Sequence, residues 1–332
     1  MASLNGSTYG YHGPPAPRAP APILPPSSAA PLWYIENERH YDLFRKGKYM
    51  FPCDQEEMNR MDIFHKFFLV ARQFDGDFGG LYRRQLPNRP RIMDLGCGTG
   101  IWAIDMADRH GGRAEILGWD LSLIQPLLIP ENVMFERRDI EEAWLGLEEG
   151  SRDLIHMSML AGSIEHWPSL YRQIYRYLKP GTGYLEHVEI DFRPECENGE
   201  MPKGSKLLTW SRELTEAMER AGRSMTPNPN TVGVLEQLGY VDVEQVRKRI
   251  PFSPWSDDAH EKDMGRWFNL GLTQGLYAMT IAPLTRMNGY NREQVIDLIN
   301  GVKKEICTRE LRAYCTMYVW TARRPSVPGQ RA

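Results

Sequence analysis

The sequence predicts a doubly wound α/β fold, and three observations support this prediction. Short apolar segments alternate with helix-like segments between residues 91 and 190, a glycine-rich turn follows the first apolar segment, and two further strand-like segments lie late in the chain. Strands separated by helices at this spacing form a parallel sheet that helices cover on both faces. Late strands suit an antiparallel edge on such a sheet. We therefore expect seven strands, the last one antiparallel.

The individual elements follow from local patterns of apolar and turn-forming residues. We expect strands at Ile92–Leu95, Ile116–Trp119, Val133–Phe135, Asp153–Met159, Tyr184–Ile190, Tyr240–Ile250 and Leu311–Ala322. We expect helices at Ile101–Arg109, Ser169–Leu178, Lys206–Ala221, Thr231–Gln237, Lys262–Met279 and Arg292–Thr308.

A further helix should precede the sheet. Asp54 followed by Glu57 is typical of a helix N-terminus, and apolar residues then recur at helical spacing to about Gln73. With the aromatic residues just before it, this helix predicts an N-terminal helical cap at residues 33–75.

The rest of the chain divides by composition. Eight of the 24 prolines lie in residues 1–31, so residues 1–32 are predicted to be a disordered Pro-rich tail or a docking segment. Residues 76–323 form the main domain, with a helical insertion at about 255–309, and residues 324–332 form a C-terminal tail. The insertion carries apolar side chains such as Trp267, Phe268 and Leu270, which either pack onto the sheet or form an exposed patch.

Composition excludes several classes of protein. The 332 residues are 25% charged and 42% hydrophobic, with a net charge of -3, so the chain has no overall attraction to nucleic acid or to anionic membranes. We see no apolar run long enough to span a bilayer and no signal peptide. The five cysteines show no metal-ligand spacing, which indicates free thiols and no zinc site.

The strongest motif lies where the first strand meets its helix. Asp94 ends the strand, and Gly96, Gly98 and Gly100 follow at alternate positions. Glycines allow a ligand to approach the main chain where a strand turns into a helix, because no Cβ intervenes. The spacing Gly-x-Gly-x-Gly differs from the Gly-x-Gly-x-x-Gly of dinucleotide sites.

Two acids follow at the ends of the next strands. Asp120, next to Leu121, ends the second strand, where a carboxylate can accept both hydrogen bonds of a ribose diol. Asp139, next to Ile140, follows the third strand, where it can accept from an adenine amino group. Together with the glycine turn, these acids predict a nucleoside-binding crevice.

The order of these motifs, with Leu178-Lys-Pro-Gly181 after them, resembles class I S-adenosylmethionine-dependent methyltransferases. The resemblance implies a Rossmann-like sheet and S-adenosyl-L-methionine as the cofactor. Asp94 and the glycine turn would hold its methionine portion, Asp120 its ribose, and Asp139 with Ile140 its adenine. The full candidate set is Asp94, Gly96, Gly98, Gly100, Asp120, Leu121, Asp139, Ile140 and Tyr49.

A narrower resemblance covers three segments: 41–54, 60–68 and 164–167. These segments are similar to fungal LaeA-like methyltransferases, which are nuclear regulators of secondary metabolism associated with velvet proteins. The resemblance implies velvet-family partners, a nuclear location (with the cytoplasm as the alternative) and a role in transcription regulation. We expect neither direct nucleic-acid binding, since no basic-aromatic patch is evident, nor membrane association.

The sequence assigns no catalytic residue. The sulfonium already makes the methyl group electrophilic, so a base is needed only if the acceptor must lose a proton. Candidate bases are His156, Glu165, His166, Glu186 and His187, each of which is more often structural than catalytic. Tyr41 or Tyr49 could hold the sulfonium by cation–π contact or could pack a cap, and Cys97 is interpreted as a bystander.

Three functions remain open from the sequence: a regulatory methyltransferase in a nuclear complex, a metabolic small-molecule methyltransferase, and a scaffold that binds the cofactor without essential turnover. The intact glycine turn and Asp120 favour cofactor binding in all three cases.

Overall fold

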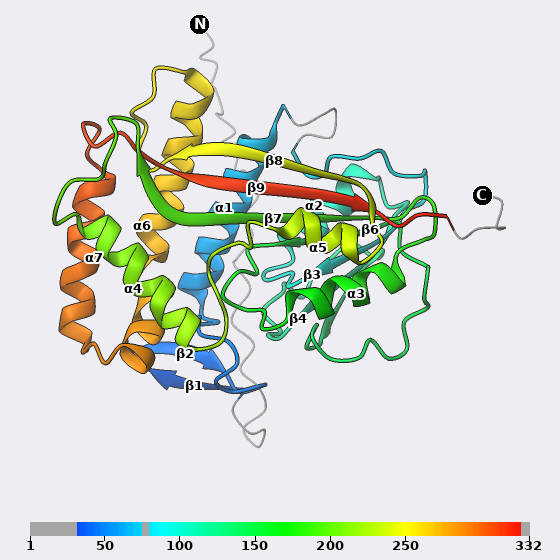
Figure 1. The fold of residues 1–332 in the computed structure, drawn as a ribbon. Helices are drawn as coiled ribbons and strands as arrows, with labels where there is room; N and C mark the ends of the chain where they lie inside the picture. Colours follow the sequence, from blue (N-terminus) through cyan, green and yellow to red (C-terminus); the bar gives the residue numbers. More distant parts are fainter. Residues whose placement is uncertain (1–31, 75–79, 327–332) are drawn as a thin grey trace, which may run out of the picture. The chain divides into compact units, whose positions relative to one another are not determined.

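A seven-stranded sheet forms the centre of the protein in a computed structural model that describes residues 32–74 and 80–326 (Figure 1). Its strands are β3 (Arg91–Leu95), β4 (Glu115–Asp120), β5 (Val133–Arg137), β6 (Leu154–Ser158), β7 (Tyr184–Cys196), β8 (Val241–Pro251) and β9 (Ala313–Arg323). Their order across the sheet is β5-β4-β3-β6-β7-β9-β8, and β9 runs antiparallel to both of its neighbours, whereas the other pairings in this sheet are parallel. The predicted fold class is confirmed, but the antiparallel strand lies inside the sheet rather than at its edge.

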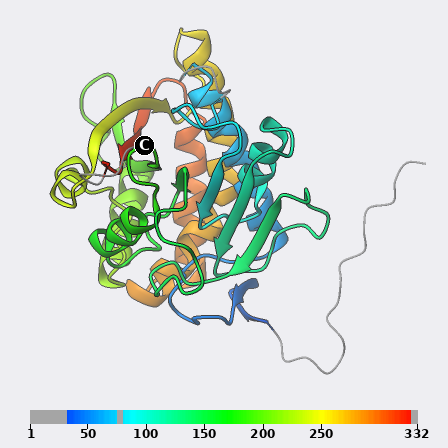
Figure 2. The same cartoon turned by 90° about the vertical axis from the view of Figure 1, so that its right-hand side faces the viewer.

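Helices cover both faces of the parallel strands β3 to β7. Side chains alternate along each strand, so that Met93 and Ile155 face α3 (Trp167–Tyr177) and α5 (Thr231–Gln237). Ile92 and Leu154 point to the opposite face, where they pack with α2 (Ile101–Arg109). Figure 2 shows the strands between these two layers. We call β3 to β6 with α2 and α3 the parallel half.

The remaining helices form a second region on the far ends of the longest strands. These helices are α1 (Gln55–Arg72), α4 (Lys206–Arg220), α6 (Ala259–Met287) and α7 (Arg292–Ile306). They share one core with the distal halves of β7, β8 and β9, which are 13, 11 and 11 residues long (Figure 1). We call this assembly the helical region.

The predicted insertion at residues 255–309 contains α6 and α7, and its apolar side chains point mainly inward. Phe268, Leu272 and Leu276 are fully buried, whereas Leu270 is 42% exposed. Of the two alternatives left open by the sequence, packing into a core therefore accounts for most of these side chains. Helix α6 also continues beyond its predicted end, through the buried Pro283 to Met287.

The sequence predicted an N-terminal helical cap, but the cap is only partly helical. An antiparallel hairpin of β1 (Trp33–Glu36) and β2 (Arg39–Asp42) precedes α1. Asn37 and Glu38, at its tip, both have positive φ angles of 49° and 63°, as a two-residue hairpin turn requires.

The predicted start of α1 is confirmed. The Asp54 side chain accepts a hydrogen bond from Glu57 N, and Arg39 also binds that carboxylate through two nitrogen atoms. This pair joins the hairpin to the helix.

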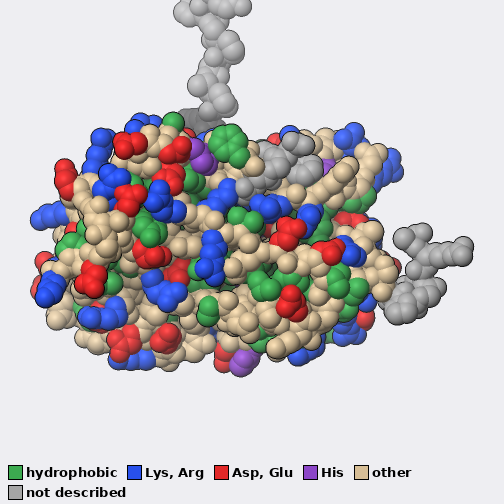
Figure 3. All heavy atoms as spheres, turned by 45° about the horizontal axis from the view of Figure 1, so that its top comes forward, with side chains coloured by type: hydrophobic (Ala, Val, Ile, Leu, Met, Phe, Trp, Pro, Cys, Tyr) green, Lys and Arg blue, Asp and Glu red, His purple; other side chains and the backbone are tan. Residues whose placement is uncertain are grey.

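Of the predicted tails, 1–32 and 324–332, residues 1–31 and 327–332 lie outside the described residues. None of the helices in residues 32–74 and 80–326 combines the length and the hydrophobicity that a bilayer-spanning segment needs. Figure 3 shows Lys and Arg side chains interspersed with Asp and Glu on the face that it draws.

Candidate functional site

A pocket lies where α1 faces the carboxyl ends of the parallel strands. It is lined from the parallel half by Asp94, Gly96, Cys97, Gly98, Thr99, Asp120, Leu121, Asp139, Ile140, Ser158, Met159, Leu160, Ser163 and Ile164, among others. From the N-terminal side it is lined by Lys48, Tyr49, Arg60, Met61, Phe64, His65 and Phe68, among others. Eight of the nine predicted cofactor-binding residues therefore meet in one pocket, and Gly100 is the exception.

The three glycines of the turn all have left-handed backbone angles, with φ of 67°, 53° and 77°. Only glycine adopts such angles without strain. A Cβ on Gly96 would lie 2.4 Å from Leu160 Cδ2, one on Gly98 3.0 Å from Met61 Sδ, and one on Gly100 2.3 Å from Phe135 Cζ. The missing side chains of Gly96 and Gly100 therefore make room for Leu160 and for a ring of β5. Gly100 also does not line the pocket, so the expectation that every glycine of the turn faces a ligand is incorrect at Gly100.

Asp94 is held in place behind the glycine turn. Its Oδ1 atom lies 2.8 Å from His156 Nδ1, and the His156 ring stacks on Trp102 with 3.8 Å between the centroids. All three side chains are buried, so this acid and its histidine form a fixed pair at the base of the pocket.

Asp120 sits at the end of β4 with both oxygens engaged by the main chain. Oδ2 accepts from Gly98 N at 2.9 Å, and Oδ1 accepts from Ser122 N at 2.8 Å. Burial raises the pKa of Asp120 to about 6, although these two hydrogen bonds act in the opposite direction. Each carboxylate oxygen can accept a further bond, so Asp120 remains suited to a ribose diol.

Asp139, after β5, is bound by the segment before α1. Lys48 Nζ lies 2.7 Å and 2.6 Å from its two oxygens, and Glu141 N donates to Oδ1 at 3.1 Å. The neighbouring Ile140 carbonyl accepts from Trp144 Nε1 at 2.9 Å. The sequence missed Lys48, because its partner lies 91 residues away along the chain.

The other wall comes from one face of α1 and from Tyr49. Burial raises the pKa of Tyr49, so its ring stays neutral, and it packs edge-on against Phe51. Arg60 pairs with the buried Glu57 through two nitrogens, at 2.9 Å and 2.6 Å. Helical periodicity predicted this apolar face, but nothing in the sequence indicated which of its residues face the pocket.

The remaining candidates lie elsewhere or are already engaged. Tyr41 lies outside the pocket, where the Arg286 guanidinium sits 5.0 Å from its ring centroid. Burial raises the pKa of the Cys97 thiol well above its ordinary value, so this pocket residue stays protonated.

Among the five candidate bases, only His156 lines the pocket, and Asp94 binds it. Glu186 pairs with Arg72 at 2.8 Å, and His187 lies between Tyr171 and Glu189, at 3.0 Å from each. Glu165 and His166 are exposed and lie outside this pocket.

The lining fits a nucleoside that carries a sulfonium. The glycine backbone lines the pocket beside Asp120, which is suited to a ribose, and Asp139 and Ile140 give one end of the pocket an acidic and an apolar group. The aromatic rings of Tyr49 and Phe64 suit a positively charged centre. In the described part of the chain, no group of three or more His, Cys, Asp or Glu side chains could hold a metal ion.

Comparison with known proteins identifies the family. Residues 36–245 match a family model described as a methyltransferase domain. The secondary metabolism regulator LAE1 of Cochliobolus heterostrophus is 48% identical over 88% of this chain and 95% of its own length. The secondary metabolism regulator laeA of Fusarium oxysporum is 42% identical over 88% and 92%, and that of Aspergillus fumigatus is 40% identical over 88% and 77%.

Among solved structures, phosphoethanolamine N-methyltransferase 2 of Haemonchus contortus with S-adenosyl-L-methionine aligns at 17% identity. That alignment covers 79% of this chain and 53% of the other, with a TM-score of 0.46. The family match confirms the predicted methyltransferase fold and the predicted cofactor, S-adenosyl-L-methionine.

Proposed function

We propose a function from one premise: this chain belongs to the LaeA family of secondary metabolism regulators and carries a class I methyltransferase domain. On that premise, we propose that it transfers a methyl group from S-adenosyl-L-methionine and thereby regulates fungal secondary metabolism and development. We further propose that it acts in the nucleus, in a complex with velvet-family proteins.

The glycine turn beside Asp120 is the observation that carries this proposal. A donor bound there would lie against the backbone of Gly96 and Gly98, and Asp120 would accept from its ribose hydroxyls. Asp139 and Ile140 would contact the adenine, while the rings of Tyr49 and Phe64 would exclude water. When bound, the cofactor supplies a methyl group that is already electrophilic, so alignment with the acceptor contributes much of the rate.

A scaffold that binds the cofactor without essential turnover is the second candidate. It is favoured by the state of the candidate bases, because His156 is held by Asp94 and the other four lie outside the pocket. An acceptor that attacks without losing a proton to the protein would still suit the first candidate.

The test separates binding, turnover and regulation. Titration calorimetry should show that S-adenosylhomocysteine binds the wild type and that a folded Gly98→Val variant has lost this binding. The same variant, returned to the fungus, should lose regulation of secondary metabolite output. Full regulation by this variant would contradict the proposed methyltransferase role. If the variant loses regulation and the wild type transfers no labelled methyl group, the result would favour the scaffold.

Location and partners need a separate experiment. A tagged protein purified from the source fungus should be enriched in nuclei and should co-purify with velvet-family proteins. A cytosolic protein with no velvet partner would support a metabolic small-molecule methyltransferase instead.

A further inference from the structure

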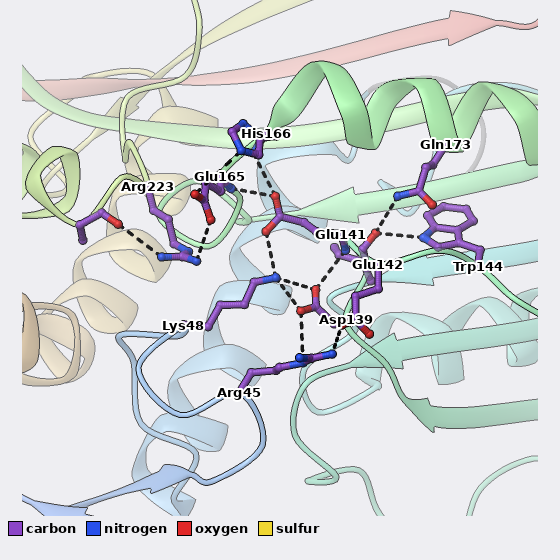
Figure 4. A network of polar contacts seen from close by, with 12 residues as sticks. Arg45, Lys48, Asp139, Glu141, Glu142, Trp144, Glu165, His166, Gln173 and Arg223 are labelled. Atoms are coloured by element: carbon purple, nitrogen blue, oxygen red, sulfur yellow. Dashed lines mark hydrogen bonds and ion pairs between the residues drawn. The ribbon is translucent and has the colours of Figure 1, made fainter.

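Glu141 joins two segments that border the pocket and lie far apart in the chain. Its Oε2 atom lies 3.1 Å from Lys48 Nζ, while Oε1 accepts from the backbone nitrogens of Glu165, at 2.9 Å, and His166, at 3.0 Å (Figure 4). The Glu141 side chain is only 14% exposed, so these interactions are partly shielded from water and salt.

On one side of Glu141 lies the segment 45–49, which we call the strap. Lys48 bridges Asp139 and Glu141, and Arg45 pairs with Glu142 and lies 3.7 Å from an Asp139 oxygen. Tyr49, the last residue of the strap, lines the pocket. The strap therefore crosses the end of the pocket where Asp139 and Ile140 lie.

On the other side lies the segment 163–166, which we call the far wall. Ser163 and Ile164 line the pocket, and the segment leads into α3. His166, the N-cap of α3, makes no capping bond with its own side chain. The Glu141 carboxylate supplies acceptors and negative charge at this helix N-terminus, where both are stabilising.

We propose that Glu141 is a positioning residue that makes the strap and the far wall close around the cofactor as one unit. This inference rests on the proposed function, because the cofactor is the molecule enclosed. If the strap opens, Lys48 leaves Glu141, but Glu141 still holds the far wall. Without the Glu141 carboxylate, the strap loses this ion pair and the far wall loses two hydrogen bonds, although Glu165 keeps its pair with Arg223 at 3.2 Å. Removal of the shared carboxylate therefore loosens both borders, whereas removal of Lys48 loosens one.

Dissociation of S-adenosylhomocysteine from the full-length protein, measured by stopped-flow competition, tests this inference. Glu141→Ala should raise the dissociation rate at least tenfold. Lys48→Met should raise it less, because the far wall stays anchored. Glu141→Gln should also raise it less, because its amide oxygen can still accept from the far wall. Glu142→Ala is the matched control: it removes the adjacent exposed carboxylate, which pairs with Arg45, and should stay within twofold of the wild type.

Salt provides a readout that a merely structural role would not change. Added salt should accelerate dissociation from the wild type, and this dependence should be weaker in Glu141→Ala. Equal rates for Glu141→Ala and Glu142→Ala would overturn the inference while leaving the proposed function intact. If Glu141→Ala fails to fold, wild-type rates in both Glu141→Gln and Lys48→Met would overturn it equally. A wild type that binds no S-adenosylhomocysteine would overturn the proposed function, and this inference with it.

Discussion

The two walls of the pocket are built in different ways. In the parallel half, the wall is largely main chain: a turn whose shape depends on left-handed glycines, flanked by acids at strand ends. On the opposite side, the wall consists of side chains from α1, a helix that also packs in the core of the helical region. The first wall depends on local backbone geometry, whereas the second depends on how helices pack against one another.

This difference implies that the two walls fail in different ways. A substitution at the turn changes the surface that a ligand touches. A large-to-small substitution in the helical region creates a cavity and lowers the stability of the whole domain. The two walls meet at Gly98, because a Cβ there would lie 3.0 Å from Met61 Sδ of α1. Four substitutions test how separate the walls are.

The largest effect is expected for Trp210→Ala, in the helical region away from the pocket. Trp210 is fully buried, and its Nε1 donates to Thr280 Oγ1 at 2.8 Å. Its loss should lower the free energy of unfolding by about 3–5 kcal/mol, measured by denaturant unfolding. Leu208→Ala, on the same helix but 42% exposed, should change it by about 0.5 kcal/mol at most. If the walls are separable, folded Trp210→Ala protein should bind cofactor normally.

Next is Gly96→Val, which acts on the wall of the parallel half. Its φ of 67° and the nearby Leu160 leave no room for a side chain, so affinity for S-adenosylhomocysteine should fall at least 100-fold, or about 2.7 kcal/mol, by calorimetry. Gly112→Val is the control, since Gly112 has a similar φ of 75° but open space around it. Equal loss of affinity in both variants would show that backbone strain, and not the pocket surface, is responsible.

Asp120 should contribute less than the turn. Asp120→Ala should weaken binding by about 1.5–3 kcal/mol, as for hydrogen bonds to a charged group. Because its pKa is raised to about 6, the carboxylate is protonated below that pH and cannot accept both ribose hydroxyls. Affinity should therefore rise as pH increases through about 6, and Asp120→Asn should flatten this profile. An unchanged profile in Asp120→Asn would assign the titration to another group.

The smallest effect is expected at Tyr49. If its ring faces the sulfonium, Tyr49→Leu should weaken binding of S-adenosyl-L-methionine by about 0.5–2 kcal/mol, while affecting the uncharged S-adenosylhomocysteine less. Paired titrations with the two ligands measure this difference. Equal losses for both would assign the ring to packing only.

The parallel half could be predicted from the sequence because its signals are local. Asp94 and Asp120 lie at the ends of the short apolar strands β3 and β4, and the three glycines come directly after β3. Strand ends in a parallel sheet meet at one edge. What remained hidden was the reason for Gly100, because Phe135 reaches it from another strand.

The helical region was predictable only as a set of amphipathic helices. Periodicity places Met61 and Phe64 on one face of α1, but it does not name the neighbour that this face meets. The hairpin before α1 was missed because its turn uses Asn37 and Glu38 at positive φ, where glycine is the usual signal.

The position of β9 has a consequence for synthesis of the protein on the ribosome. This strand is made after the other six of the sheet, yet it lies between β7 and β8 and pairs with both. Until residues 313–323 leave the ribosome, β7 and β8 have unpaired edges that can pair with strands of other chains. A message truncated before this strand would therefore yield an aggregation-prone product rather than a shortened but working protein, and chaperones would have to protect the nascent chain until its final stretch is complete.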